Sequence, residues 1–263
     1  MNKTTDIDFY KLYKKYTPAK SNTTLFDDYV SLTDDEDASV ESVRNSFNKL
    51  IIENYANEAV VKHFFVKQVC LNKKNASAVT IFELKSNSSR GDLCTINGHS
   101  RVYEIKTEFD SFNRLDSQIG NYSLTFDFTY VILAEKHVKQ ALKILPRNVG
   151  IYTYKHCKNG LHFSLFRSGK ESKSLCPKTQ LEQMPIAKLR TLSSSLIEKS
   201  KTAMISELLF KYSPKEVNRF FKDYYKSEYM EKWGFIVENH DRLFPLDFQW
   251  FFKNPISPTL VYF

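Results

Sequence analysis

The chain has 263 residues and a mass of 30.8 kDa, which is enough to bury one large core, or a core and a smaller helical region, without disulfides. Its 38 Lys and Arg outnumber 30 Asp and Glu, and the net charge of +8 favours polyanionic partners. Four widely spaced cysteines and a polar N-terminus argue against a zinc cluster, a disulfide framework, a signal peptide or a membrane span. We therefore expect a globular cytoplasmic protein that makes no use of a membrane.

The first 37 residues are predicted to form an N-terminal arm. They combine short helical potential between Phe9 and Tyr16 with an acidic run at 34–37. Thr33 and Glu36 have capping-box spacing and precede apolar residues at helical intervals, so one or two helices are expected within 34–70.

A β-hairpin is the clearest local prediction of the sequence. Segments 92–96 and 99–107 are strand-like and flank Asn97-Gly98, a dipeptide that suits the positive φ values of a hairpin turn. A helix is expected next, capped by Asp110 or Ser111, with apolar residues three and four apart as far as Tyr122.

Further elements follow in alternation. Strands are expected at 130–134 and 149–152, a short helix at 138–145 that Pro146 ends, and an edge strand at 161–167. This order predicts an α/β (α+β) fold with a central mixed sheet flanked by helices. The expected divisions are an arm at 1–37, a core domain at 38–178 and a C-terminal helical region at 179–263.

The C-terminal region contains a well-marked helix start, with Ser213 as N-cap, Pro214 at N1 and Glu216 at N3. Four basic residues then fall on one face of this helix at intervals of four, three and four: Lys215, Arg219, Lys222 and Lys226. Such a stripe could follow a phosphate backbone, or could be the solvated face of a packed amphipathic helix.

Three residues of the hairpin supply the groups needed for phosphodiester hydrolysis. That reaction uses converging carboxylates, which hold a hard cation, and usually a nearby ammonium group. Glu104 and Lys106 are two apart on one strand and so share a face, and the hairpin returns Asp92 beside them. A strict two-residue turn would pair Asp92 with Tyr103 and place the two carboxylates on opposite faces. We therefore predict a bulge or a three-residue turn that corrects the register.

The spacing of Asp92, eleven residues and then Glu104-Ile105-Lys106 resembles the PD-(D/E)XK nuclease superfamily, which has a restriction-endonuclease-like fold. The Arg90-Gly91-Asp92 stretch departs from the Pro-Asp of the superfamily name. Residues 80–155 more narrowly resemble an uncharacterised bacterial family named after an "sce" locus, through Phe82-Glu83-Leu84, Arg90-Gly91-Asp92, Asn97-Gly98, Tyr103-Glu104-Ile105-Lys106, Arg114-Leu115, Gln118, Tyr122, Phe126-Asp127 and His137.

The resemblance implies roles for individual residues. Asp92 and Glu104 would bind Mg²⁺ or Mn²⁺, and Lys106 would orient the attacking water or stabilise the pentavalent phosphate. Glu83 would lie on or just after the first core helix and support the metal, and Gln118 would orient the water or the substrate. Arg114, which borders the same helix face as Gln118, is a candidate contact to nucleic acid, although an exposed helix cation would look the same.

These expectations add up to a Mg²⁺- or Mn²⁺-dependent nuclease that prefers DNA to RNA, with a role in restriction, defence or mobile-element biology by analogy. Two alternatives stay open at this point. One is a catalytically silent nucleic-acid-binding or protein-interaction module with a nuclease fold, and the other is an RNA-cleaving toxin. The C-terminal helices could also hold a second copy of the chain or another protein.

Overall fold

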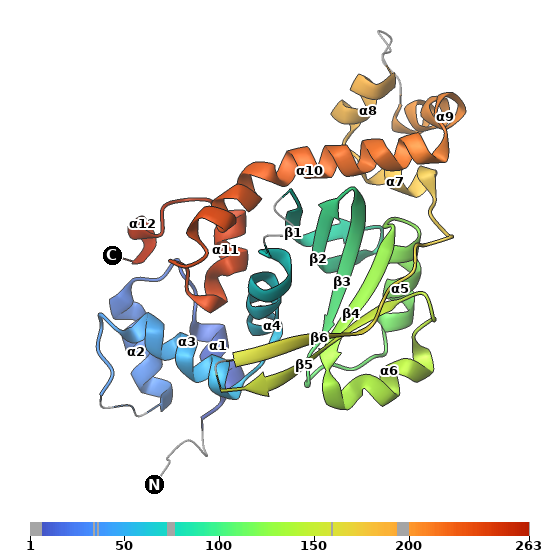
Figure 1. Cartoon of the computed structure of the whole chain (residues 1–263). Coiled ribbons are helices and arrows are strands. Elements are labelled where there is room, and N and C mark those ends of the chain that lie inside the picture. The colour runs from blue at the N-terminus through green and yellow to red at the C-terminus, as the bar shows by residue number, and fades with distance from the viewer. Residues whose placement is uncertain are drawn as a thin grey trace.

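A six-stranded sheet with the strand order β1-β2-β3-β4-β5-β6 lies at the centre of the computed structural model (Figure 1). The structure describes residues 7–33, 35, 37–72, 77–158, 160–193 and 200–262. The strands are β1 (Val79–Ser86), β2 (Ser89–Asn97), β3 (His99–Lys106), β4 (Phe128–Ala134), β5 (Gly150–Cys157) and β6 (Gly160–Arg167).

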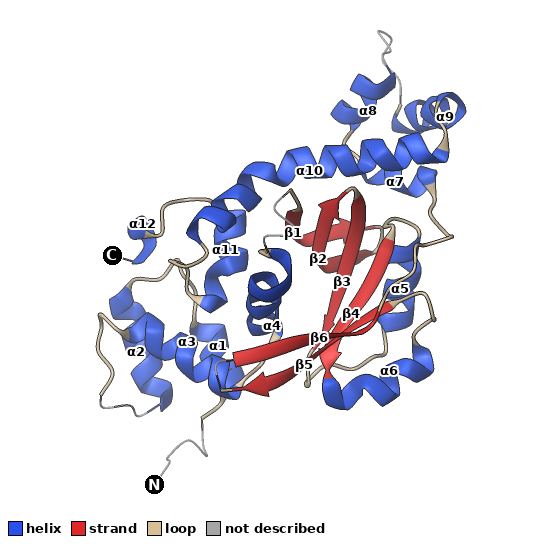
Figure 2. Cartoon of the chain, in the orientation of Figure 1, coloured by secondary structure: helices blue, strands red, loops and turns tan. Residues whose placement is uncertain are grey.

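The connections explain the mixed character of this sheet. Strands β1, β2 and β3 form an antiparallel meander, whereas β3, β4 and β5 are parallel and are joined through helices. Strand β6 returns antiparallel to β5 and forms one edge. The prediction of an α+β fold with a central mixed sheet flanked by helices is therefore confirmed (Figure 2).

Helices surround the sheet and extend beyond both ends of it. They are α1 (Phe9–Lys15), α2 (Asn22–Thr33), α3 (Val43–Asn54), α4 (Glu58–Phe65), α5 (Leu115–Ser123), α6 (Val138–Ile144), α7 (Pro177–Gln183), α8 (Ile186–Ser193), α9 (Lys201–Lys211), α10 (Pro214–Asn239), α11 (Phe248–Lys253) and α12 (Thr259–Tyr262). A π-helical turn η2 (Val66–Cys70) continues α4, and 3₁₀ turns η4 (Glu135–His137) and η5 (Pro245–Asp247) precede α6 and α11. No helix of the described ranges is both long and apolar enough to cross a bilayer.

Alternate residues of β3 face two different helices. Glu104 and Lys106 contact Tyr122 and Gln118 of α5. Tyr103 instead packs its ring against Phe65 of α4, with ring centroids 5.0 Å apart. Since neighbouring side chains of a strand point to opposite faces, α5 and α4 cover opposite sides of the sheet.

The β2–β3 hairpin has the register that the sequence analysis required. Leu93 pairs with Tyr103 and Asn97 pairs with His99, so Gly98 alone stands between the last paired residues. Continuing this register by one residue places Asp92 opposite Glu104. The three-residue turn Asn97-Gly98-His99 makes the correction, and Gly98 has the positive φ of 68° that such a turn needs.

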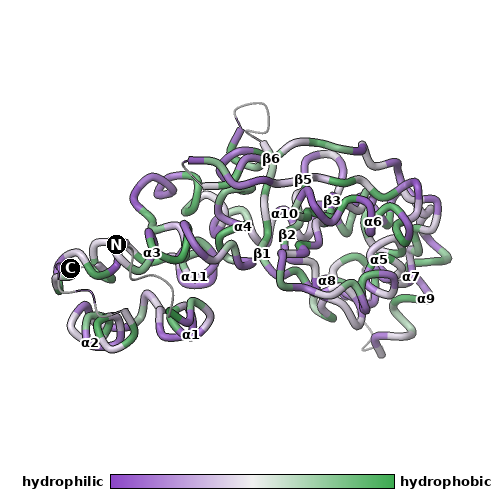
Figure 3. The backbone as a smooth tube through the Cα atoms, turned by 90° about the horizontal axis from the view of Figure 1, so that it is seen from below, coloured by the Kyte–Doolittle hydropathy of each residue, from purple (hydrophilic) through white to green (hydrophobic). Residues whose placement is uncertain are grey.

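The N-terminal helices pack against the C-terminal end of the chain. The hydroxyl of Tyr16 in the α1–α2 connection donates to Asp247 Oδ2 of η5 at 3.1 Å, and Asn48 of α3 accepts from the backbone N–H of Leu246 at 3.0 Å. Figure 3 shows α1, α2 and α3 at one end of an elongated molecule and α8 and α9 at the other.

Two predicted helix starts were wrong. Thr33 does not cap a new helix but ends α2, and its hydroxyl donates to the carbonyl of Tyr29, while its expected partner Glu36 lies outside the described residues. Asp110 does not begin α5, because its carboxylate accepts from the N–H and hydroxyl of Thr107 at 2.8 and 2.7 Å and so stabilises a turn instead. Helix α5 begins at Leu115, after Arg114.

Helix α10 begins where the sequence analysis placed it. Ser213 and Glu216 form a reciprocal capping box, and Pro214 stands in the first turn. This helix of 26 residues passes across the β1 side of the sheet and connects α9 with the α11 region (Figure 1).

Candidate active site

Asp92 of β2 and Glu104 of β3 are buried neighbours on adjacent strands, with exposed fractions of 9% and 3%. Asp92 Oδ2 accepts a hydrogen bond of 2.6 Å from the backbone N–H of Ile105. This bond ties the Asp92 side chain to the strand that carries Glu104. The hairpin register and the local hydrogen bond together bring the two carboxylates into one site.

Helix α5 holds Glu104 in place. Glu104 Oε1 accepts from Lys106 Nζ at 2.7 Å and from Gln118 Nε2 at 2.6 Å, and Oε2 contacts the hydroxyl of Tyr122 at 2.6 Å. Lys106 Nζ also donates to Gln118 Oε1 at 3.1 Å. The structure therefore brings Glu104, Lys106 and Gln118 together, as the sequence analysis expected, and adds Tyr122 as a further partner.

Glu83 reaches the site from β1, so its predicted position on or just after the first core helix was wrong. It falls between the pairs Phe82–Leu93 and Leu84–Gly91, opposite Asp92, and makes no regular pair there. Its φ of 60° is unusual for a residue with a Cβ and marks a local irregularity in the strand. The carboxylate forms ion pairs with Lys62 and Arg90.

The helix that precedes the sheet contributes Glu58 and Lys62, which the sequence analysis missed. Lys62 is 1% exposed, and its ammonium contacts Glu58 at 2.5 Å, Glu83, and the Gln249 side-chain oxygen of α11 at 2.8 Å. The signal in the sequence was a lysine inside the otherwise apolar run Ala59-Val60-Val61-Lys62, one turn after a glutamate. A buried lysine needs carboxylate partners, so such a pattern indicates an internal ion-pair site.

Three carboxylates of this site are close enough to share a cation. Single oxygens of Glu58, Glu83 and Asp92 all lie within 4.8 Å of one another. Glu104, which was expected to bind the metal together with Asp92, is not a member of this group and instead accepts hydrogen bonds from Lys106 and from side chains of α5.

The charges of the cluster act strongly on one another. Burial and the neighbouring charges of Glu104 and Glu58 raise the pKa of Asp92 well above its ordinary value. Burial alone would also raise the pKa of Glu83, but Lys62 and Arg90 outweigh it and the pKa is lowered. The site is thus an acidic pocket in which Lys62 supplies the main buried positive charge.

A cleft of about 750 Å³ opens onto Asp92, Glu104 and Lys106. Arg114 and Gln118 line it from the α5 side, and Glu58 and Arg90 line it as well. Arg114 therefore shares this cleft with the carboxylates, and its contact with nucleic acid stays a prediction.

The predicted basic stripe of α10 lies elsewhere. Lys215, Arg219, Lys222 and Lys226 do share one face, and they line a separate hollow of about 510 Å³ beside Gly98 and His99 at the hairpin tip. The tip is five residues from Glu104 along β3, roughly 17 Å at the usual rise per residue. The ammonium group of Lys222 already makes hydrogen bonds within the protein, to Gly98 O at 2.8 Å and to Asp127 Oδ2 at 3.2 Å.

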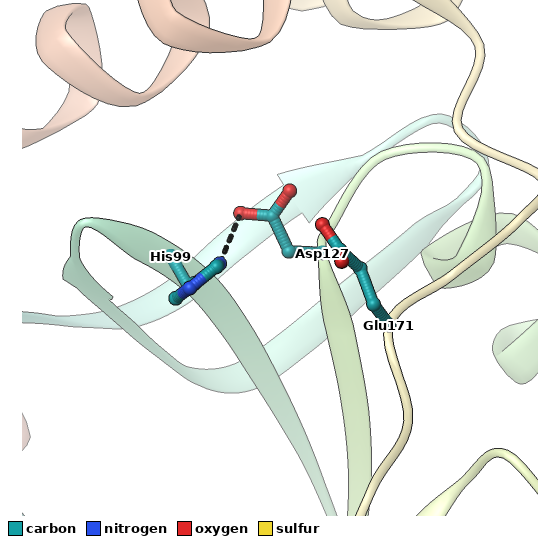
Figure 4. A group of neighbouring side chains, drawn as sticks. All are labelled: His99, Asp127 and Glu171. Atoms are coloured by element: carbon teal, nitrogen blue, oxygen red, sulfur yellow. Dashed lines mark ion pairs between the residues drawn. The ribbon is translucent and has the colours of Figure 1, made fainter. Parts of the chain in front are cut away.

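A second group with metal-binding side chains consists of His99, Asp127 and Glu171 (Figure 4), of which His99 and Glu171 line this hollow. The Asp127 carboxylate already accepts from the N–H and hydroxyl of Ser100 at 2.7 and 3.1 Å and from Asn218 at 2.7 Å. Together with the Lys222 contact, these bonds occupy both of its oxygens. The residue therefore anchors α10 to the beginning of β4, which is a structural role.

Comparison with known proteins identifies relatives among bacteriophages. A family model described as bacteriophage P4 protein cII matches residues 45–248 of the chain. Protein cII of Enterobacteria phage P4 is 29% identical over 83 residues, a match that spans 32% of this chain and only 31% of that relative.

One solved structure also resembles this chain, a protein of unknown function called SPO1766 from Silicibacter pomeroyi. The two are 16% identical with a TM-score of 0.34, and the match covers 51% of this chain and 94% of the other.

Proposed function

This chain belongs to the bacteriophage P4 protein cII family, and from the geometry of its carboxylate site we propose that it is a metal-dependent nuclease that hydrolyses phosphodiester bonds, in DNA rather than RNA. The observation that carries the proposal is the register of the β2–β3 hairpin. It sets Asp92 opposite Glu104, with Lys106 two residues further along the same face. A one-residue shift would separate the carboxylates, so the turn geometry has a direct chemical consequence.

The donor set fits a hard divalent cation. Carboxylate oxygens are the ligands that Mg²⁺ and Mn²⁺ prefer, and Glu58, Glu83 and Asp92 offer three within a small volume. Glu104 stands next to Asp92 and would complete or support the set. When bound, such a cation polarises a phosphate and lowers the pKa of an attacking water.

The protein's own groups provide positioning and charge. Tyr122 and Gln118 hold the Glu104 carboxylate in one orientation, which leaves Lys106 Nζ beside it at the wall of the cleft. From there an ammonium group can donate to a water or to a phosphate oxygen that gains charge in the transition state. Arg114 adds a planar cation suited to holding an adjacent phosphate.

A polyanionic substrate is favoured by charge at two levels. The whole chain carries +8, and the α10 stripe adds cations along the same hairpin as the cleft. A nucleic-acid strand that contacts both the cleft and the basic stripe of α10 would span several nucleotides. We also propose a preference for DNA over RNA, and an assay that offers both substrates tests it.

One observation favours the alternative of a binding module without turnover. The Lys62 ammonium contacts Glu58 and Glu83 and so supplies the positive charge that a metal would bring. A cluster neutralised in this way could persist without a cation. Binding of Mn²⁺ that depends on Asp92 therefore separates the two functions.

The test is cleavage of labelled single-stranded DNA, duplex DNA and RNA in Mg²⁺ or Mn²⁺. Wild type should cleave DNA, and Glu104→Gln and Lys106→Gln should each lower the rate by about 100-fold or more, because each removes an interaction made at the reacting phosphate. Glu108→Gln and Lys136→Gln are the matched controls, since these residues pair with each other outside the cleft and should keep the wild-type rate.

Cleavage of RNA alone would move the assignment to the RNA-cleaving alternative. If wild type cleaves none of the substrates and binds no Mn²⁺ through Asp92, the nuclease proposal fails and the binding module takes its place.

A further inference from the structure

The face of the sheet opposite α5 carries its own pocket, of about 280 Å³. Its lining includes Thr95 of β2, Arg101 and Tyr103 of β3, Tyr130 of β4 and Tyr152 of β5. Helix α4 covers only part of this face, where Phe65 packs against Tyr103 and Tyr152 at 5.0 and 5.1 Å between ring centroids. The pocket that remains near the hairpin tip is lined by polar side chains and by tyrosines, of which Tyr103 is buried and Tyr130 and Tyr152 are partly exposed.

The pairing of the strands builds this surface residue by residue. Arg101 pairs with Thr95 on one side and Phe128 on the other, and Tyr103 pairs with Tyr130. The rings of Tyr103 and Tyr130 are stacked with centroids 5.4 Å apart, and Tyr152 lies 5.6 Å from Tyr130. Three tyrosines on three adjacent strands thus form one continuous patch.

A glycine keeps Tyr130 in its place. A Cβ at Gly150, the cross-strand neighbour of Tyr130, would come within 2.1 Å of that ring, so only glycine allows the ring to lie there. Gly150 therefore provides the space that the Tyr130 ring occupies.

Arg101 borders this patch and is its source of positive charge. Its guanidinium lies 5.4 Å from the centroid of the Phe128 ring, and within the described parts of the chain no carboxylate forms an ion pair with it. It is half-buried, so its planar donors are held near the pocket rather than extended into solvent. A guanidinium in this setting is suited to a phosphate.

From this geometry we propose that the pocket binds a single nucleotide, with its base against the tyrosine rings and its phosphate on Arg101. The lining combines aromatic rings with the hydroxyls of Thr95 and the tyrosines, which suits a flat, hydrogen-bonding heterocycle better than a purely apolar ligand. Base–aromatic stacking stabilises such complexes by roughly 1–3 kcal/mol per base.

This site is independent of the carboxylate cluster, since Arg101 and Tyr103 face the side of β3 opposite to Glu104. The nucleotide could arrive free in solution or as one unit of a single strand. The two sources share the same chemistry, and the experiment separates them.

The experiment uses 2-aminopurine, whose fluorescence is quenched when it stacks on an aromatic ring. One arm contains the free 2-aminopurine nucleotide, and the other a thymidine strand of about 10 nucleotides with one 2-aminopurine. Both are titrated with the full chain in EDTA, so that the result does not depend on metal binding or cleavage. Quenching in the first arm identifies a free nucleotide, and quenching in the second alone identifies a single strand; either supports the proposal.

Arg101→Gln and Tyr152→Leu should weaken the quenching complex by about tenfold or more, while Tyr152→Phe, which keeps the ring, should retain it. The matched controls are Arg190→Gln and Tyr10→Leu, two exposed residues far from the pocket in sequence. Circular dichroism and melting curves establish that each variant is folded. No quenching in either arm, or equal quenching by the pocket variants and wild type, would overturn the proposal and leave the nuclease proposal untouched.

Discussion

Lys62 is the residue on which the charge balance of the carboxylate cluster depends. Burial alone would lower the pKa of this lysine, but Glu58, Asp92 and Glu83 together raise it, so the ammonium stays charged inside the protein. Its ammonium group contacts side chains of α4 and β1 and, through Gln249, of α11. One side chain thus links the site to a distant part of the chain.

Lys62→Met is expected to remove this internal cation while keeping the length of the side chain. Without metal, the variant should have a lower free energy of unfolding, because Glu83 then keeps only its ion pair with the exposed Arg90. With Mn²⁺, its affinity should rise by about tenfold, since a competing positive charge has gone. Chemical denaturation with and without Mn²⁺, and calorimetric titration, measure the two effects.

Lys67→Met is the matched control, because Lys67 pairs with Asp241 at 3.2 Å on the surface, where solvent screening leaves such pairs little effect on stability. An affinity for Mn²⁺ that is unchanged or weaker in Lys62→Met would contradict the counter-ion role.

At the scale of elements, the β2–β3 hairpin determines which side chains meet. Its turn carries Gly98 with a φ of 68°, and nothing lies within 4 Å of a Cβ built there. Any cost of substitution at this position therefore comes from the backbone conformation and not from a clash.

Gly98→Ala should lower the free energy of unfolding by about 1 kcal/mol, whereas Gly98→Asn should cost less, because asparagine tolerates the left-handed region. Urea denaturation measures both. Equal stability of the alanine variant and wild type would show that the turn adopts another conformation, and the register argument for Asp92 and Glu104 would then lose its basis.

At the scale of the whole molecule, a buried carboxylate joins the two ends of the chain. Asp247 accepts from the hydroxyls of Tyr16 at 3.1 Å and Tyr262 at 2.7 Å, and burial raises its pKa from 3.8 to about 7. The folded state therefore binds a proton more tightly than the unfolded state. The contribution of this group to stability is fully present below about pH 4 and is lost as the pH rises through about 7.

Asp247→Asn should remove this dependence, because an amide does not titrate. The stability of the variant relative to wild type should therefore increase between pH 5 and pH 8, by about 3 kcal/mol, because about two pH units separate pH 5 from the folded-state pKa of about 7. Urea denaturation at both pH values measures the difference. A difference that stays constant between them would show that Asp247 is ionised throughout this range.

The sequence by itself determined the hairpin, the pairing of Glu104 with Lys106 on one face, the α10 cap and the order of the later strands, because these depend on local periodicity and turn chemistry. Only the tertiary structure decided that Glu83 lies in β1, that Glu58 and Lys62 enter the site, and that the α10 stripe lines a different hollow. Those contacts join residues from separate elements, and the packing of α4, β1 and α10 around the sheet sets them. Local sequence patterns do not predict which helix packs against which strand. The partners of a buried charge can therefore be identified only in the tertiary structure.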